Sequence, residues 1–469
     1  TREDTVRDRL LFKPGERYSG RVLDETERLL RNTSFLDDAR VRPIDYHDGV
    51  VDVEVQTYDI WTLNPGISFG RSGGKNSAGF ELEERNLLGY GSEMVLSIKS
   101  TVDRDTVKLI YQDPNVGSSW WNLRLFYSNN SDGAGKGIDL QRPFYALDTR
   151  DAYGFALNQE TRVEPRYDLG EIVDEFEVET RTAKLFRGWS AGLHENWVSR
   201  VTGGISVEWD QFASVAGNHP TLTLPEDRKL VYPWISREWI QDEFRKEFNR
   251  DQIRKTEDVS LGWNISLRLG YASPDLGADR YAWLLKSAMD KGFKLSRRQT
   301  VLMKAELAGR MEHGTGKNIR ISELLRYYFR QSPHRLTFLS LGADFDINPD
   351  ADRQLLLGGD NGLRGYPLRY QGGEGRWLLS LEQRLYTNWY PFRLFNVGAA
   401  LFADVGSTWG DNPYGSQSLG LLRDLGFGLR LGNSRSALGN VIHLDFAFPL
   451  DGDADISKFQ FLVQTKRSF

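Results

Sequence analysis

The sequence contains no cysteine. This absence excludes a disulfide framework and a metal site built from thiolates. It also suits a chain that crosses an oxidising compartment, where a free thiol could mispair. Basic residues are not in excess, because 60 Lys and Arg stand against 65 Asp and Glu, for a formal net charge of -5. With no basic excess and no Lys/Arg block, we expect no nucleic-acid partner.

Long apolar runs are absent too. No segment approaches the ~18 consecutive apolar residues of a transmembrane helix, and the mean hydropathy is -0.50. A membrane β-barrel nevertheless remains compatible with this value, because only every second residue of its strands must be apolar. The 13 Trp and 19 Tyr are residue types that favour membrane interfaces. The alternative is a soluble all-β protein with a Trp-rich core.

Residues 1–60 differ in pattern from the rest of the chain. Val6, Leu10 and Leu11 lie at helical spacing, and Ser19 is predicted to cap a second helix with one apolar face. Two strands follow around a His-Asp-Gly turn. A two-stranded sheet is marginal on its own, so we expect a further strand upstream of this sequence. The pattern also contains no signal-peptide segment, so any targeting sequence is expected to lie upstream or to have been removed.

From residue 61 onward the pattern has period two and keeps it to residue 469. Most runs supply the ~9–11 residues that a membrane strand needs. Gly, Asn and Asp clusters separate the runs, as hairpin loops do. Charged residues fall mainly on the face opposite the apolar stripe, as a polar lumen requires. We therefore predict a transmembrane antiparallel β-barrel over residues 61–469.

The number of strands is less sharply defined. Five runs follow Gly375, and about fifteen precede it, so the segmentation predicts sixteen to twenty strands. The segment 230–252 alternates poorly and predicts either a helix or an excursion outside the membrane. A soluble propeller should show a fixed repeat of ~40 residues, and we find none. The five later runs are 376–388, 394–409, 420–431, 440–449 and 457–469.

Three motifs resemble one known family. The first is Leu363-Arg364-Gly365-Tyr366, inside a glycine-rich loop assigned to residues 351–375. The second is the Phe-x-Asp-x-Gly pattern of Phe402, Asp404 and Gly406, preceded by Glu382 in the neighbouring run, and the third is the helix-helix-strand-strand start. Together they resemble BamA/TamA-type outer-membrane assembly factors and two-partner-secretion transporters.

The resemblance implies a mainly β fold in the bacterial outer membrane. It implies a POTRA-like α+β domain over 1–60, lacking its first strand and facing the periplasm, followed by a barrel of sixteen strands. It also implies that the loop 351–375 folds back into the barrel lumen. Two features depart from the family pattern: the middle of the chain is long for sixteen strands, and Gln464 stands where the C-terminal signal usually carries glycine.

The residues support a docked loop independently. Period two places Glu382 and Asp404 on adjacent strands with both side chains inward. Two such carboxylates without a cation would repel each other and desolvate poorly. The planar fork of Arg364 can bond both, and Gly365 lets the backbone approach the wall. The predicted loop site comprises Leu363, Arg364, Gly365, Tyr366, Glu382, Asp404 and Gly406.

The family and the residues predict protein insertion, assembly or translocation through a laterally opening seam. The seam joins the first strand, weakened by glycines, to the last, and unpaired backbone there could receive a client strand. The POTRA-like domain would receive clients in the periplasm. The alternatives are a two-partner-type secretion pore, and a barrel that anchors an upstream catalytic domain. The predicted seam residues are Ile67, Phe69, Phe459, Phe461, Val463 and Phe469.

The sequence predicts no enzyme. It carries no nucleotide-binding loop, no His-Glu-x-x-His and no nucleophile elbow, and its 6 histidines are scattered. We therefore expect no catalytic residue, no cofactor and no metal site. Expected partners are outer-membrane lipids and lipopolysaccharide, unfolded outer-membrane or secreted protein clients, and periplasmic accessory proteins.

Overall fold

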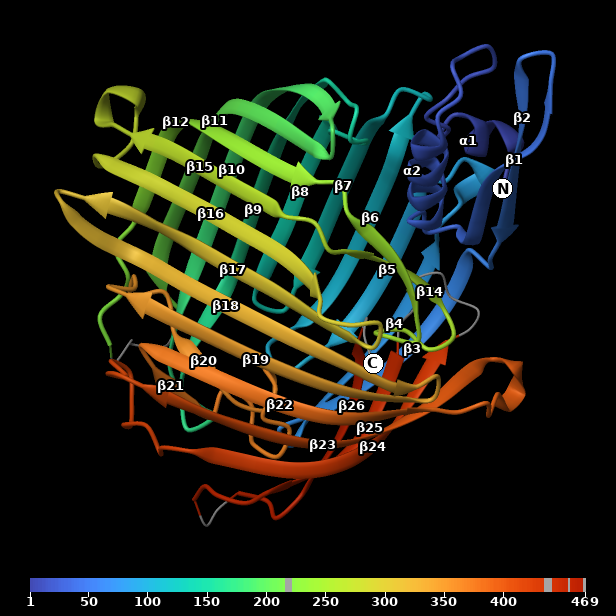
Figure 1. Ribbon diagram of the computed structural model, residues 1–469. Coiled ribbons are helices and arrows are strands. Elements are labelled where there is room, and N and C mark those ends of the chain that lie inside the picture. Colours follow the sequence, from blue (N-terminus) through green and yellow to red (C-terminus); the bar gives the residue numbers. More distant parts are fainter. Residues whose placement is uncertain (216–221, 434–440, 454–455, 467–469) are drawn as a thin grey trace.

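The computed structural model describes residues 1–215, 222–433, 441–453 and 456–466. A small N-terminal region lies beside a closed antiparallel β-barrel (Figure 1). The barrel contains twenty strands in the part of the chain that is described. Twenty is the upper end of the range predicted from the segmentation, and the family-based number of sixteen is wrong. The middle region accounts for the additional strands, because all of its hairpins except one are part of the barrel wall.

Each barrel strand pairs with its neighbour in the chain, and the last strand, β26, pairs with the first, β3. The wall is formed by β3 (Leu63–Ser72), β4 (Lys75–Glu84), β5 (Glu93–Ser100), β6 (Asp105–Val116), β7 (Trp121–Asn130), β8 (Gly133–Arg142), β9 (Asp151–Asp168), β10 (Glu171–His194), β11 (Trp197–Ser214), β12 (Arg228–Gln241), β15 (Asn264–Ala272), β16 (Ala282–Lys294), β17 (Gln299–Glu312), β18 (Thr315–Ser332), β19 (Arg335–Ile347), β22 (Gly375–Tyr386), β23 (Phe395–Trp409), β24 (Leu422–Asn433), β25 (Val441–Pro449) and β26 (Gln460–Lys466).

The N-terminal region contains α1 (Glu3–Arg7), α2 (Gly20–Arg31), β1 (Leu36–His47) and β2 (Val50–Asp59). This is the predicted order of helix, helix, strand and strand. Asp48 and Gly49 both have positive φ, as a two-residue hairpin turn requires. The apolar face of α2 packs on β1 around Leu30, which is fully buried. Assignment of this unit as a periplasmic POTRA domain stays a prediction.

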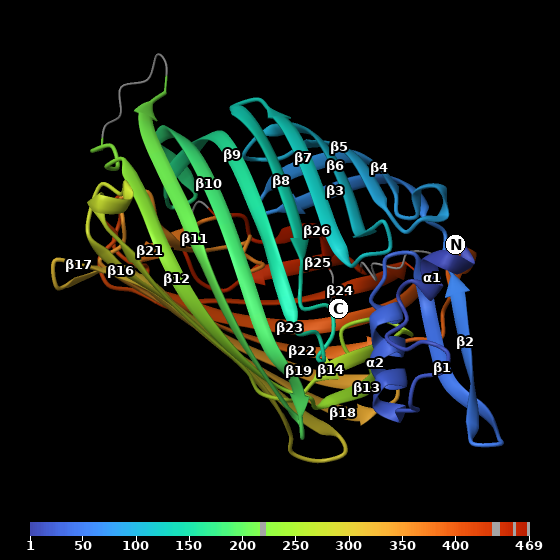
Figure 2. The same ribbon diagram turned by 90° about the horizontal axis from the view of Figure 1, so that it is seen from above.

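The N-terminal region contacts one end of the barrel, which we call the proximal end. The Thr5 hydroxyl donates to the carbonyl of Gly89 at 2.8 Å, in the connection between β4 and β5. The Glu25 carboxylate accepts from the backbone N–H of Leu147 at 2.6 Å, in the connection between β8 and β9. Figure 2 shows α1 and α2 lying against this end. The opposite end, which carries the connection between β19 and β22, is the distal end.

The hairpin of β13 (Phe244–Phe248) and β14 (Thr256–Ser260) is the one that stays out of the wall. It lies between β12 and β15 in the chain and at the proximal end in space, next to α2 (Figure 2). The poorly alternating segment 230–252 therefore comprises most of β12 followed by an excursion, and no helix is formed within it.

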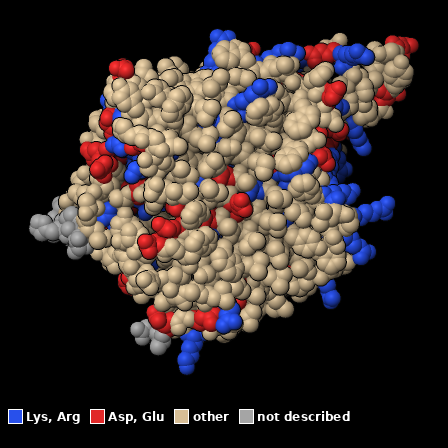
Figure 3. All heavy atoms as spheres, turned by 60° about the vertical axis from the view of Figure 1, so that its left-hand side comes forward, with Lys and Arg blue, Asp and Glu red and all other residues tan. Residues whose placement is uncertain are grey.

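The barrel wall separates apolar from charged side chains. Ile67 is 90% exposed and Leu401 is 59% exposed on the outer surface, whereas Asp404 is fully buried inside. Figure 3 brings the distal end forward and shows charged side chains gathered near the middle of this face, with broad areas of the outer wall free of them. This separation explains how a chain with negative mean hydropathy presents an apolar exterior. None of the helices among the described residues is long and apolar enough to cross a membrane.

Candidate functional site

A long connection between β19 and β22 lies inside the barrel. It begins with β20 (Leu355–Leu357) and ends with β21 (Gln371–Gly373), which pair with each other as a short two-stranded sheet. The residues between these strands include the Leu363–Tyr366 motif, and Leu363 and Tyr366 are fully buried. We call residues 351–375 the motif loop.

Arg364 lies between two carboxylates from adjacent strands. Its Nε and Nη2 donate to Asp404 of β23 at 2.6 and 2.8 Å, and its Nη1 donates to Glu382 of β22 at 2.8 Å. The guanidinium also stacks over the ring of Phe402, 3.5 Å from the ring centre. This bidentate, stacked geometry is specific to arginine, because lysine offers a point charge without a planar fork.

The backbone around Arg364 is held equally closely. The N–H of Gly365 donates to Asp424 of β24 at 2.9 Å. A methyl group at Gly365 would lie 2.7 Å from the Asp424 Cβ, so no side chain fits there. The Tyr366 hydroxyl donates to the carbonyl of Arg423 at 2.8 Å. Gly406 leaves room for Leu357, which would lie 3.1 Å from a Cβ at that position.

The motif loop also reaches the opposite wall. The Arg369 Nη2 donates to Asp103 at 2.9 Å, and Gln354 exchanges two hydrogen bonds with the backbone of Tyr167 in β9. In the closed order of strands, β9 is ten positions from β23 in a ring of twenty. The loop therefore crosses the full diameter of the lumen.

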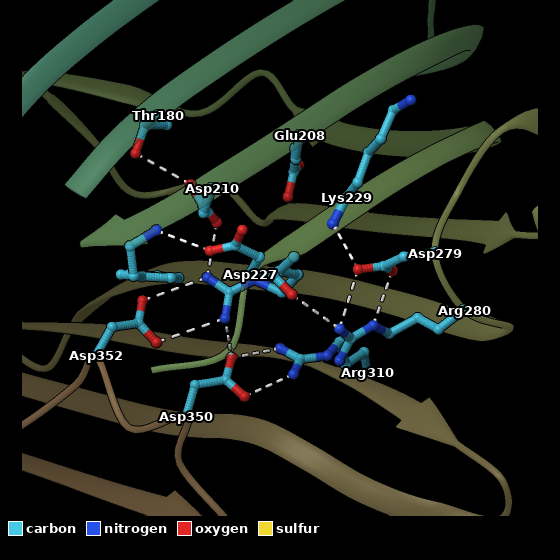
Figure 4. Close-up of polar contacts among 12 residues, drawn as sticks. Thr180, Glu208, Asp210, Asp227, Lys229, Asp279, Arg280, Arg310, Asp350 and Asp352 are labelled. Atoms are coloured by element: carbon cyan, nitrogen blue, oxygen red, sulfur yellow. Dashed lines mark hydrogen bonds and ion pairs between the residues drawn. The ribbon is translucent and has the colours of Figure 1, made fainter. Parts of the chain in front are cut away.

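A third attachment lies just before β20, at the distal end (Figure 4). Asp350 accepts two hydrogen bonds from Arg310 of β17, both at 2.6 Å, and another from Arg228 of β12 at 2.8 Å. Asp352 lies beside Asp350 in this network and also contacts Arg228, at 3.3 Å. Asp350, one residue before the motif loop, and Asp352 within it thus fix the start of the loop to basic side chains of two further strands.

The loop site continues toward the proximal end through Arg384. Its Nε donates to the second oxygen of Glu382 at 2.9 Å, and its Nη1 donates to the carbonyl of Arg250 at 3.1 Å. Arg250 lies in the turn between β13 and β14. The Tyr386 hydroxyl donates to the same carbonyl at 2.9 Å. The hairpin turn is therefore linked to Arg364 through two side chains, Arg384 and Glu382.

The closure between β26 and β3 is short within the described residues, which end at Lys466. Val463 opposite Arg71 is the one register pair recorded between these strands within the described residues, whereas β3 and β4 are paired along their whole length. Gln464 adds a hydrogen bond to the Ser72 hydroxyl at 3.2 Å. Of the predicted seam residues, Ile67, Phe69 and Phe459 are exposed on the outer surface, and Phe461 is half-buried. Phe469 lies outside the described residues.

Residues 86–465 match the family model described as the Omp85 superfamily domain. The chain belongs to the Omp85 superfamily. As a member, it is an outer-membrane β-barrel protein. No curated protein matches it.

Several solved structures are similar to this chain, and the two of CdiB share its fold. CdiB from Escherichia coli is 12% identical, with a TM-score of 0.51 over 98% of this chain and 74% of that one. CdiB from Acinetobacter baumannii is 13% identical, with a TM-score of 0.50 over 98% and 71%. BamA from Haemophilus ducreyi, lacking POTRA domains 1–3, is 14% identical, with a TM-score of 0.44 over 99% and 82%.

Sequence reasoning missed several contributors to the loop site. Asp424 lies on the same inward face of β24 as Gly426 and Gly428, so period two alone could have identified it. Arg384 lies two residues after Glu382, so the same alternation places its side chain on the inward face of β22. The contact with Arg250 had no such signal, because it depends on how the β13–β14 hairpin folds against the barrel.

Proposed function

We propose that this Omp85 barrel inserts or translocates proteins through lateral opening between β3 and β26. The observation that carries the proposal is the short closure: among the described residues, β3 and β26 share one register pair, whereas their other edges are paired along their whole length. Unpaired backbone at a strand edge is a template for another strand. A client strand could therefore add to β3 with little loss of existing pairing.

The proposed clients are unfolded outer-membrane or secreted proteins. The N-terminal region would face the periplasm and receive them along the exposed edge of its two-stranded sheet, where β1 pairs only with β2 among the described residues. No covalent chemistry is required, because folding of the client supplies the driving force. We accordingly propose that the barrel itself is not an enzyme, and that lipids, lipopolysaccharide and accessory proteins are its other partners.

A reversible lock on the seam tests the proposal. Extending the register from Val463 and Arg71 places Thr465 opposite Phe69. The double variant Phe69→Cys/Thr465→Cys carries the only two thiols in the chain, because the natural sequence has none. Oxidation should stop client insertion into proteoliposomes, and reductant should restore it.

The matched control keeps Thr465→Cys and places the second thiol on β25, which pairs with the other edge of β26. Ile442 is opposite Thr465 in the β25–β26 pair, so Ile442→Cys/Thr465→Cys forms a bridge that leaves the seam free. This control should insert clients normally when oxidised. Normal insertion by the oxidised seam variant would contradict lateral opening, and continued export of a soluble partner through it would favour the secretion pore.

A further inference from the structure

A cavity of about 460 Å³ lies at the proximal end, under the β13–β14 hairpin. Its floor consists of inward residues of three wall strands: Thr300, Tyr328 and Leu336, which are all buried. The hairpin covers one side. The connections after β16, β18 and β22 form the rim.

The lining of this cavity is strongly cationic. Six lining side chains are basic, and Glu247 is the one acidic residue among those that line it. The six are Arg245, Lys246, Arg254, Arg297, Arg298 and Arg330.

Three of these cations already have a hydrogen-bond or ion-pair partner. Arg245 lies 3.6 Å from Glu247, Lys246 pairs with Glu27 of α2, and Arg330 donates to the carbonyl of Asn249 at 3.0 Å. The side chains of Arg254, Arg297 and Arg298 make no recorded hydrogen bond or ion pair with the described part of the chain. The cavity is therefore lined by three exposed arginines, from two connections, that have no carboxylate partner among the described residues.

A cavity lined by several guanidinium groups and a single carboxylate suits a phosphate. A phosphate group offers several oxygens for bidentate N–H donors, and such charge-assisted bonds are the strong ones. The volume exceeds that of one phosphate, and the floor adds a hydroxyl, a phenol ring and an apolar side chain. The ligand would thus carry an organic group beside its phosphate.

The rim connections also bear exposed apolar side chains. Trp389 and Phe392, in the connection after β22, are 63% and 86% exposed, and Leu295 precedes the two rim arginines. Exposed tryptophan and other aromatic residues mark the headgroup level of a membrane, where anionic lipid phosphates lie within reach of basic side chains.

We propose that this cavity binds a phosphate ester through Arg254, Arg297 and Arg298. The source is either the headgroup of an anionic phospholipid at the membrane rim or a soluble phosphate compound. The two sources share one chemistry and differ only in what the phosphate is attached to. The site is separate from the seam, and neither the proposed insertion nor its lock experiment depends on it.

The test measures ligand retention by the full chain purified in detergent micelles. One arm uses native mass spectrometry after reconstitution with phosphatidylcholine, with or without phosphatidylglycerol. The other arm uses equilibrium dialysis against glycerol 3-phosphate. Arg297→Gln/Arg298→Gln should weaken phosphatidylglycerol or glycerol 3-phosphate binding at least about tenfold, because each lost bond is charge-assisted.

The control is Arg187→Gln/Arg237→Gln. These arginines are exposed on the outer face of β10 and β12, beside Trp189 and Trp239, and they do not line the cavity. Binding by the control should equal wild type. Arg254→Gln, on the hairpin side, provides a second variant in case the rim variant fails to fold.

Each outcome decides the proposal. Retention of phosphatidylglycerol alone identifies a lipid headgroup site, and binding of glycerol 3-phosphate alone identifies a soluble ligand. Binding of neither ligand would overturn the proposal. Equal losses of binding in the rim and control variants would also overturn it, because they would show an effect of general surface electrostatics.

Discussion

At the scale of single residues, the central feature is a buried arginine held by two buried carboxylates. Arg364 is 5% exposed and Asp404 fully buried. Removing charges from water costs several kcal/mol per ion, and only full pairing offsets this cost. Arg364 therefore stabilises the docked loop mainly because its absence would leave the buried Asp404 without a cationic partner and Glu382 with Arg384 alone.

Arg364→Ala should destabilise the barrel by about 3–5 kcal/mol, the cost of breaking a buried pair. The measurement is the temperature at which the folded form is lost in semi-native electrophoresis. Adding Asp404→Asn should restore part of the loss, because the charge of Asp404 is then removed while Glu382 keeps its pair with Arg384. Arg423→Ala is the matched control: it breaks a bidentate pair with Asp451 of 2.7 and 2.8 Å that lies on the surface, and it should change little.

Glu257, in β14, should make the hairpin sensitive to pH. Burial, together with the nearby charge of Asp251, raises the pKa of Glu257 to about 7. Glu247 is its cross-strand neighbour. A raised carboxyl pKa means that the folded state binds the proton more tightly, so stability falls as pH rises from about 4.5 to 7.

Hydrogen exchange of residues 244–260, corrected for the intrinsic rate, should show weaker protection at pH 8 than at pH 5. Glu257→Gln should remove most of this difference. An unchanged pH dependence in the variant would assign the effect to other groups.

At the scale of elements, the β13–β14 hairpin links the N-terminal region to the loop site. Asp258 accepts from Arg31 of α2 at 2.8 to 3.0 Å, and Arg28 lies over the Phe244 ring at 3.8 Å. The other end of the hairpin receives Arg384, which bonds Glu382. A displacement of α2 would therefore be transmitted through the hairpin and Arg384 to Glu382, the partner of Arg364.

Asp258→Ala should loosen α2 from the barrel. We expect faster proteolysis between residues 1–60 and the barrel, and a smaller but measurable loss of heat stability for the loop site, since the hairpin turn loses support. Asp52→Ala, in the exposed tip of the N-terminal sheet, is the control. Unaltered proteolysis of the Asp258 variant would show that other contacts hold α2.

The limits of sequence reasoning follow from the same elements. Period two located the inward faces of β22 and β23, and the structure places Arg364 between Glu382 and Asp404. The β13–β14 hairpin has no period that distinguishes it from wall strands, so its position depends on tertiary contacts. The proposed phosphate-binding cavity could not be predicted from the sequence for a related reason. Its arginines lie in separate segments, and no basic block exists along the chain.

At the scale of the whole molecule, the motif loop crosses the lumen from wall to wall. It is attached to β22–β24, to β9 and to the pair β12 and β17, so its attachments are spread around the ring. A rigid crossing of this kind should leave little room for ions.

Asp350→Asn/Asp352→Asn should increase single-channel conductance in planar bilayers, because Arg228 and Arg310 lose their loop partners. Asp279→Asn, at the same end and paired with Arg280 outside the loop, should conduct like wild type. Equal conductance in all three proteins would mean that the remaining attachments suffice.

The short closure of the ring has a consequence for the order of folding. Ser72 and Gln464, which bond across it, are 392 positions apart, whereas Arg364 is only 18 and 40 positions from its two carboxylates. Contacts of long sequence separation form slowly. The loop with β22 and β23 is thus expected to assemble early as a local nucleus. The remaining strands then add around a lumen that is already filled, and the edge that closes last is the edge proposed to open.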